Sequence, residues 1–297
     1  MAILTVNNLS KNYGTIQALK NVSFPVPKGV VFGILGPNGS GKTTLLGTVT
    51  DIIKPTGGSL TLFDEAPSGE SRRRIGTLLE TPNFYSYLSA TKNLEITAAI
   101  KRKGKDEIRD VLEMVDLTGR STFRFSSYSL GMKQRLAIAA CLLGDPEVLI
   151  FDEPTNGLDP VGIAEIRQVM KNLHTRGKTI IMASHLLDEV EKVCTHVAIL
   201  KRGQLLTSGP VEEILTKEEI IEVSSADLDQ LLQVIKEFPN LSRAEKAEPI
   251  LRLYFSAGQG NPSALNDFCH NHGISLNHLS AKRKSLESRF IELTNNN

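Results

Sequence analysis

The sequence predicts an α/β fold, in which buried strands alternate with helices. Short continuous apolar runs, typical of strands buried on both faces, occur at 30–35 (VVFGIL), 147–154 (EVLIFDEP) and 179–185 (TIIMASH). Apolar residues at helical spacing lie between these runs, over 91–117 and 132–143. The first run leads through a glycine-rich loop directly into a helical pattern, which is the strand, loop and helix order of a phosphate-binding unit.

The elements around this core differ in pattern. Residues 2–9 and 22–27 alternate apolar and polar side chains as half-buried strands do, and 197–209 has the pattern of a hairpin. Composition changes near Lys217, after which strands and amphipathic helices follow in the order β-α-β-β-α-β, with a closing helix at 286–293. We therefore expect two domains, residues 1–216 and residues 217–297.

Composition narrows the functional classes. The 297 residues carry 34 Lys and Arg against 33 Asp and Glu, a net charge of +1, so direct nucleic-acid binding is not expected. The basic runs at 71–74 and 101–105 are interpreted as solvated faces.

The three cysteines, Cys141, Cys194 and Cys269, lack metal-ligand spacing and indicate a reducing compartment. No signal peptide and no apolar run of about 20 residues is recognised, so we expect membrane contact only through a partner chain.

The glycine-rich loop has the spacing G-x-x-x-x-G-K-T. Its glycines allow backbone N–H groups to face phosphate oxygens, and the helix that follows adds positive potential at its N-terminus. Lys42 is expected to reach the β- and γ-phosphates, and the Thr43 hydroxyl is expected to ligate magnesium. The predicted cofactor-binding residues of this loop are Gly36, Pro37, Asn38, Gly39, Ser40, Gly41, Lys42, Thr43 and Thr44.

Polar side chains follow the other two buried runs. Asp152 and Glu153 end one run, where a carboxylate reaches the edge of the sheet; Asp152 is predicted to hold magnesium and Glu153 to polarise the attacking water. His185 ends the next run and is predicted to contact the γ-phosphate. An acidic turn and a structural histidine are the alternative interpretations, which the upstream phosphate loop makes less favourable.

A further motif, YSLGMKQR at 128–135, narrows the prediction. With this motif, the chain resembles the ATP-binding subunits of ABC transporters over about residues 3–215. Tyr13 matches the aromatic residue that stacks on adenine, Ser129 and Gly131 match the signature that contacts the γ-phosphate, and Asp159 matches the loop that crosses the dimer. The resemblance implies a P-loop NTPase of the ABC ATPase type, with an N-terminal antiparallel β subdomain and a helical subdomain. A small α+β C-terminal domain completes the expected fold.

The resemblance also implies partners. In the family, ATP and Mg²⁺ are sandwiched between two ATPase chains, so we expect a homodimer or heterodimer joined to integral membrane permease subunits. This places the chain in the cytoplasm, peripheral to the inner face of the cell membrane. The C-terminal segment is similar to that of ABC exporters and favours export.

The chain departs from the usual family pattern at three positions. Leu130 stands where glycine is usual and Met132 where glutamine is usual, while Ser129 and Gly131 are kept. Glu80 stands where a glutamine normally touches magnesium and the attacking water. An ionised carboxylate only accepts hydrogen bonds, yet it can still ligate a metal, so Glu80 is predicted to be both catalytic and metal-binding. This acidic loop is similar to that of bacitracin-type and lantibiotic-immunity exporters, although a tolerated swap on a loop is the alternative.

The leading prediction is therefore the ATPase of an exporter for a peptide antibiotic or another drug-like substrate. The alternative is a non-transport ABC ATPase acting on ribosomes or nucleic acid, whose usual members carry two cassettes or a long coiled coil. A third possibility, an unrelated phosphate-loop kinase, would lack the YSLGMKQR motif and the downstream histidine.

Overall fold

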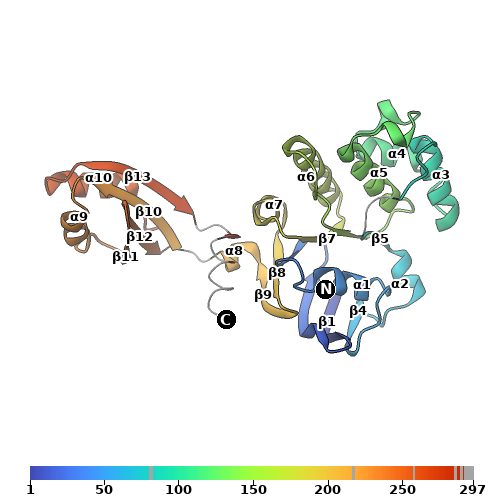
Figure 1. Cartoon of the computed structure of the whole chain (residues 1–297), viewed down its shortest axis with the longest axis horizontal. Helices are drawn as coiled ribbons and strands as arrows, with labels where there is room; N and C mark the ends of the chain where they lie inside the picture. The colour runs from blue at the N-terminus through green and yellow to red at the C-terminus, as the bar shows by residue number, and fades with distance from the viewer. Residues whose placement is uncertain (80–82, 216–217, 257, 284–285, 288–289, 291–297) are drawn as a thin grey trace. The chain divides into compact units, whose positions relative to one another are not determined.

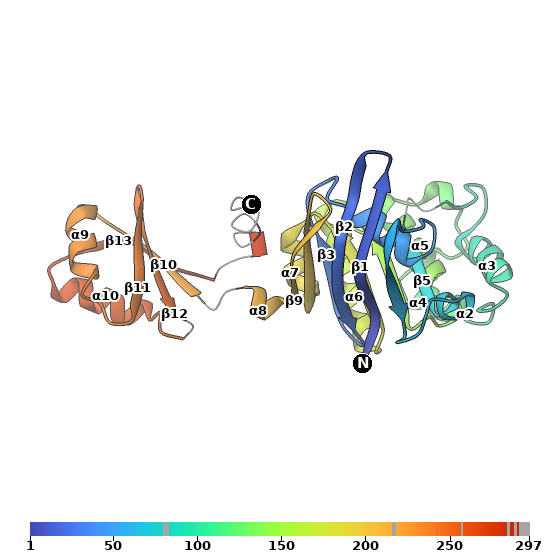
Figure 2. The same cartoon turned by 90° about the horizontal axis from the view of Figure 1, so that it is seen from below.

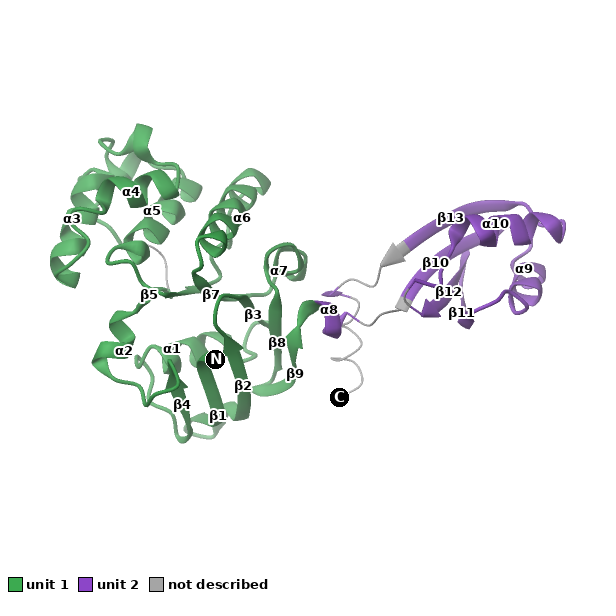
Figure 3. Ribbon diagram, turned by 180° about the vertical axis from the view of Figure 1, so that it is seen from behind, with its two compact units in different colours: residues 1–211 green, residues 212–297 purple. Residues whose placement is uncertain are grey.

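The computed structural model describes residues 1–79, 83–215, 218–256, 258–283, 286–287 and 290. Contacts divide the chain into two compact units, residues 1–211 and 212–297 (Figure 3). The boundary predicted between 216 and 217 falls on residues outside those described, so its position stays a prediction. Each unit is considered by itself below.

A six-stranded sheet forms the centre of the first unit (Figure 1). Its neighbouring strands are parallel, except that the last strand pairs antiparallel with the one beside it. The strands β3, β6 and β7 are apolar and almost wholly buried, as the continuous apolar runs predict. In sheet order the strands are β5 (Ile75–Leu78), β6 (Val148–Asp152), β7 (Thr179–Ser184), β3 (Val31–Leu35), β8 (His196–Lys201) and β9 (Gln204–Pro210).

An antiparallel sheet of three strands supplies the second layer. It has the order β2 (Ile16–Pro27), β1 (Ala2–Tyr13) and β4 (Gly57–Leu62). Its apolar side chains share one core with β3 and with helix α1 (Lys42–Val49); Phe24 stacks on Phe32 with ring centroids 5.4 Å apart. This sheet confirms the predicted N-terminal antiparallel subdomain.

Helices complete the first unit, and α3, α4 and α5 gather on the β5 side of the sheet (Figures 1 and 2). The predicted helical stretch 91–117 is wrong in one respect, because the structure breaks it between Arg102 and Glu107. Arg102 and Gly104 adopt left-handed backbone angles there, with φ of 56° and 81°, which no continuous helix contains. The helices are α2 (Gly69–Arg73), α3 (Ala90–Lys101), α4 (Ile108–Met114), α5 (Leu130–Leu142), α6 (Pro160–Thr175) and α7 (Leu187–Val193), with short 3₁₀ turns at Thr118–Arg120 and Phe125–Ser127.

The second unit begins with the short helix α8 (Val211–Ile214) at the division and continues in the predicted β-α-β-β-α-β order. Its four strands form an antiparallel sheet in the order β11-β12-β10-β13, and both helices pack apolar residues into its core. This confirms the predicted α+β fold, while most of the expected closing helix at 286–293 lies outside the described residues. The elements are β10 (Glu218–Ser225), α9 (Leu228–Ile235), β11 (Leu241–Ala247), β12 (Ile250–Ser256), α10 (Pro262–Asn271) and β13 (Leu276–Arg283).

All three cysteines are free and buried. The Cys141 thiol donates a hydrogen bond to the carbonyl oxygen of Thr77 at 3.0 Å, and burial raises the pKa of Cys141 to about 12. Burial also raises the pKa of Cys194 and of Cys269. These thiols therefore remain protonated at neutral pH and act as small apolar side chains.

Across the part of the chain that the structure describes, the helices are too short or too polar for any of them to cross a lipid bilayer.

Candidate functional site

The glycine-rich loop joins the end of β3 to the start of α1, as predicted. Gly36 and Gly41 have φ of 156° and 107°, a region that side-chain-bearing residues rarely adopt. A Cβ atom at Gly36 would lie 2.4 Å from the Leu200 carbonyl oxygen, and one at Gly41 would lie 2.6 Å from the Ala18 carbonyl oxygen. The loop thus packs against two neighbouring strands at a distance that only glycine permits.

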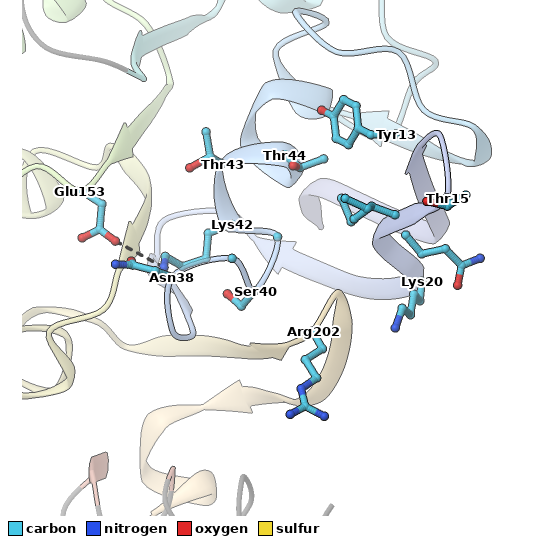
Figure 4. Close-up of a pocket in the computed structure, with 15 residues that line it drawn as sticks. Tyr13, Thr15, Lys20, Asn38, Ser40, Lys42, Thr43, Thr44, Glu153 and Arg202 are labelled. Carbon is cyan, nitrogen blue, oxygen red and sulfur yellow. Dashed lines mark ion pairs between the residues drawn. The ribbon is translucent and has the colours of Figure 1, made fainter.

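Lys42, the first residue of α1, is held by its own loop. Its ammonium group donates to the Gly36 carbonyl oxygen at 2.8 Å and lies 3.4 Å from the Glu153 carboxylate (Figure 4). The side chain is only 6% exposed. A buried ammonium needs such partners, and a phosphate oxygen would offer it a stronger one.

Asp152 at the end of β6 lies beside Thr43. The Thr43 hydroxyl donates to Asp152 Oδ2 at 2.7 Å, while Oδ1 is buried without a hydrogen-bond partner among the described residues. Burial is the main reason that the pKa of Asp152 is raised, and the hydrogen bond from Thr43 opposes it. A hydroxyl and a carboxylate with an unused oxygen are the hard oxygen donors that Mg²⁺ selects, so this pair fits the predicted metal.

Glu153 and His185 form a second pair at the same edge of the sheet. His185 Nδ1 lies 2.8 Å from Glu153 Oε2, and the Glu153 N–H donates to the Ala183 carbonyl oxygen of β7 at 3.0 Å. Glu153 adopts a left-handed φ of 48°, which turns the chain directly after the strand. The carboxylate thus lies between an imidazole and the Lys42 ammonium, at the position predicted for a water-polarising group.

A cavity of about 780 Å³ opens from the loop toward the N-terminal sheet (Figure 4). It is bordered by the predicted loop residues at 38–44, by Glu153 and by Tyr13, which is 47% exposed and has Lys11 Nζ 5.0 Å from its ring centroid. Gly36 and Pro37, also predicted to bind the cofactor, do not line this cavity. Other lining residues were not predicted from the sequence: Thr15, Ile16, Gln17, Ala18, Lys20 and Arg202. For the five of these residues at 15–20, the sequence did hold a signal, because they directly follow the predicted adenine-stacking residue, Tyr13.

The signature residues lie elsewhere in the first unit. Ser129 caps α5 by accepting a hydrogen bond from the Met132 N–H at 3.2 Å, and Asp159 caps α6 by accepting from the Gly162 N–H at 2.9 Å. Ser129, Gly131 and Asp159 line a separate cavity of about 510 Å³. The lining residues of this cavity and of the phosphate-loop cavity do not overlap in the described chain.

Arg135, the last residue of the YSLGMKQR motif, positions this second cavity. Its guanidinium donates to the Asp116 carbonyl oxygen at 2.9 Å and lies 3.5 Å from Glu165 on α6. One buried side chain therefore ties α5 to the end of α4 and to α6. Glu80, the remaining predicted site residue, lies outside the described residues, and its role stays a prediction.

Comparisons with known proteins agree with this geometry. Residues 19–156 match the family model described as ABC transporter. A bacitracin transport ATP-binding protein, BcrA of Bacillus licheniformis, is 36% identical across 98% of this chain and 97% of its own length. The chain belongs to the ABC transporter ATP-binding family.

Two further relatives extend the likeness. A lantibiotic transport ATP-binding protein, SrtF of Streptococcus pyogenes, is 35% identical over 74% of this chain and 99% of its own length. A dimeric ATP-binding cassette in a post-hydrolysis state with ADP and Pi has a TM-score of 0.61 and 28% identity, covering 70% of this chain and 98% of that one. This ABC protein is an ATPase that binds and hydrolyses ATP.

The two cavities of this ABC ATPase offer different chemical groups. At the carboxyl ends of β3, β6 and β7, the phosphate-loop site brings the loop and its Lys42 beside three acid–base side chains. These are Asp152, Glu153 and His185, and Glu153 also lines the cavity itself. The signature cavity offers a hydroxyl, Ser129, at the N-terminus of a 13-residue helix. The two are chemically complementary toward a triphosphate, but they are separate surfaces of one chain.

Proposed function

We propose that this ABC ATPase powers the export of a peptide antibiotic through separate membrane permease subunits. The observation that carries the proposal is the likeness to the bacitracin transport protein, which spans 98% of the chain and so includes the C-terminal α+β unit. The likeness to a lantibiotic transport protein supports the same class of cargo. Other drug-like substrates are the nearest alternatives.

In the proposed reaction, Glu153 polarises the attacking water and His185 orients that carboxylate and contacts the γ-phosphate. The 2.8 Å contact between the two supports this pairing. Lys42 and the loop N–H groups bind the phosphates, and Thr43 and Asp152 are the residues that would hold Mg²⁺. When bound, the metal would neutralise charge on the phosphate oxygens.

The separation of the two cavities supports a dimer. Two copies, or one copy and a close relative, would place Ser129 and Gly131 of one chain against the phosphates held by the other, with Asp159 near the junction. Because Ser129 and Asp159 are already bound to their own helix N-termini, each is fixed in orientation before a partner arrives.

Association with the inner face of the membrane is proposed to occur through the permease. Glu80 is followed in the sequence by two aromatic residues, Tyr85 and Tyr87, which are 51% and 65% exposed and whose ring centroids lie 5.9 Å apart. Exposed paired aromatic rings are typical of protein interfaces. They support a permease contact beside the Glu80 loop.

Co-purification with the neighbouring membrane proteins, followed by reconstitution in vesicles, tests the proposal. ATP-dependent movement of bacitracin or a lantibiotic across the bilayer is the expected result. Recovery with ribosomes or DNA and without a permease would instead favour the non-transport alternative.

Exchange of Glu80 for glutamine tests coupling. We expect Glu80→Gln to change transport per ATP hydrolysed while nucleotide affinity stays close to that of the wild type, because the exchange removes a charge beside the metal but not the phosphate cradle. Equal losses in ATP binding and in coupled turnover would contradict this role.

A further inference from the structure

A cleft in the first unit, separate from the two cavities of the nucleotide site, is lined mainly by positive side chains. Its volume is about 940 Å³, and it lies between α2, the start of β5 and the end of α3. Six lining residues are cationic and one, Glu70, is acidic. In a chain with a net charge of only +1, this is a strong local concentration of charge. The cations are Arg72, Arg73, Arg74, Lys101, Arg102 and Lys103.

The cleft brings together the two basic runs at 71–74 and 101–105, which were predicted to be solvated faces. Lys103 Nζ joins them, because it donates to the Arg73 carbonyl oxygen at 3.3 Å and to the Gly144 carbonyl oxygen at 2.9 Å. Lys101 Nζ donates to carbonyl oxygens at the end of α5, the nearest being that of Ala140 at 2.8 Å. Figure 2 shows α2 and α3 on the same side of the unit. The two lysines thus hold the walls of the cleft in place.

Only part of the charge is neutralised by carboxylates. Arg74 binds Glu147 at 2.7 Å, and Arg72 lies 3.4 Å from Asp51. The Nε atom of Arg72 is buried without a hydrogen-bond partner among the described residues.

The two exposed arginines of the cleft, Arg73 and Arg102, are less strongly paired than Arg72 and Arg74. Among the described residues, the Arg73 side chain pairs with Glu70 alone, at 3.6 Å; the two side chains are 77% and 84% exposed, so the attraction is weak. The exposed side chain of Arg102 has no hydrogen bond or ion pair to any residue that the structure describes. Guanidinium donors therefore remain available at the mouth of the cleft.

The chemistry of this cleft selects a class of ligand. Guanidinium groups bind phosphate oxygens through two parallel hydrogen bonds, and several arginines together favour a multiply charged anion. Ile75, Ile100, Leu143 and Pro146 add an apolar wall beside the cations, and Ile100 is 77% exposed. The volume lies in the range of small-molecule sites. We propose that this cleft binds a phosphate-bearing anion, supplied either by the headgroup of an acidic phospholipid or by a soluble phosphorylated molecule.

The double variant Arg73→Gln/Arg102→Gln tests the proposal, because it removes the two exposed arginines of the cleft and leaves the anchoring lysines. The matched control is Arg109→Gln/Lys171→Gln, which removes two exposed cations from α4 and α6, outside the cleft. Unchanged melting temperature and unchanged ATP hydrolysis in both variants show that the fold and the nucleotide site are intact.

Two binding measurements distinguish the sources of phosphate. In the first, labelled pyrophosphate is titrated at low ionic strength in the presence of saturating ADP, which fills the phosphate-loop site. In the second, flotation is measured with phosphatidylcholine vesicles that contain or lack phosphatidylglycerol. In whichever assay the wild type binds, we expect the Arg73→Gln/Arg102→Gln variant to bind about tenfold more weakly, and salt to weaken the wild type further.

The two assays together support or overturn the proposal as follows. Pyrophosphate binding that the cleft variant loses and the control keeps supports a soluble ligand, and the same pattern with phosphatidylglycerol vesicles supports a lipid headgroup. Binding in neither assay overturns the proposal. Equal binding by the cleft variant and the control overturns it as well.

Discussion

The phosphate-loop cavity and the signature cavity differ in which groups hold their functional side chains. In the first, the charged groups bind one another: Lys42 lies 3.4 Å from Glu153, Glu153 lies 2.8 Å from His185, and Thr43 donates to Asp152. In the second, among the residues that the structure describes, the side chains of Ser129 and Asp159 bind the N-termini of their own helices alone. The first cavity is therefore an internal network that a ligand must rearrange, whereas the second is a fixed surface.

This difference separates two kinds of contribution. We propose that residues of the network act on the reacting atoms, so their loss should alter chemistry within one chain's own site. Residues of the fixed surface should matter only when a second chain is present. Four substitutions test this comparison, from the largest expected effect to the smallest.

Glu153→Gln is expected to have the largest effect. The amide keeps the shape of the side chain but cannot accept a proton, so ATP hydrolysis should fall about 100- to 10,000-fold while ATP binding persists. Phosphate release and equilibrium nucleotide binding measure the two quantities. The exposed Glu113→Gln variant serves as the control, and hydrolysis by Glu153→Gln within a few-fold of that control would remove Glu153 from the reaction.

Ser129→Ala should lower hydrolysis by about a hundredfold, the usual effect of losing one donor to a developing negative charge. It also removes a helix cap, at a cost of about 1 kcal/mol in the free energy of unfolding. Ser89→Ala is the matched control, because Ser89 caps α3 in the same way by accepting from the Lys92 N–H at 3.2 Å. Stability measured by denaturant should fall alike in both, and hydrolysis should fall only in Ser129→Ala. A parallel loss of hydrolysis in Ser89→Ala would reduce Ser129 to a capping residue.

Tyr13→Ala should weaken ATP binding about tenfold, because a base stacked on an aromatic ring gains about 1–3 kcal/mol. Tyr13→Phe keeps the ring and should bind ATP nearly as well as the wild type. Nucleotide titration compares the three proteins. If the phenylalanine variant were as weak as the alanine variant, the hydroxyl and not the ring would be the binding group.

Asp152→Asn is expected to have the smallest effect of the four. Unlike the other substitutions, it should improve the property that is measured, because it should raise the free energy of unfolding. The pKa of Asp152 is raised in the folded state, chiefly by burial, so the folded protein holds this proton more tightly than the unfolded chain does. The resulting stabilisation is present at low pH and is lost as pH rises through the folded-state pKa. At neutral pH without metal, Asp152→Asn should therefore melt at a higher temperature than the wild type.

Melting curves across pH check the sign of this effect. The difference between Asp152→Asn and the wild type should shrink as pH falls, because the native carboxyl then becomes neutral too. The exposed Asp110→Asn variant should show no such difference. A gap that widened toward low pH would exclude the buried carboxylate as its cause.

The sequence predicted the parts of the site that depend on local pattern. The phosphate loop, the carboxylate pair and His185 each sit at the end of a continuous apolar run, and parallel strands bring those ends to one edge of the sheet. The C-terminal β-α-β-β-α-β order was equally readable, because its periodicities of two and of about 3.6 alternate cleanly.

Features that depend on long-range contacts were not predicted. Arg202 reaches the nucleotide cavity from the turn between β8 and β9, more than 180 residues from Tyr13, and has no motif of its own. The two basic runs meet where Lys103 donates to the carbonyl oxygens of Arg73 and Gly144. The spacing of residues in the sequence does not indicate that Arg202 lies at the nucleotide cavity or that the two basic runs lie side by side. The break near Gly104 was locally signalled by the glycine, but helical spacing on both sides concealed it.

The buried state of the three thiols makes the protein suitable for optical study. Cys141, Cys194 and Cys269 are shielded and protonated, so maleimide dyes should ignore them under native conditions. A single cysteine introduced at the rim of either cavity would then be the one residue that the dye labels. Energy transfer between two such labelled copies would follow their association and dissociation in real time. The three native cysteines would not have to be replaced first.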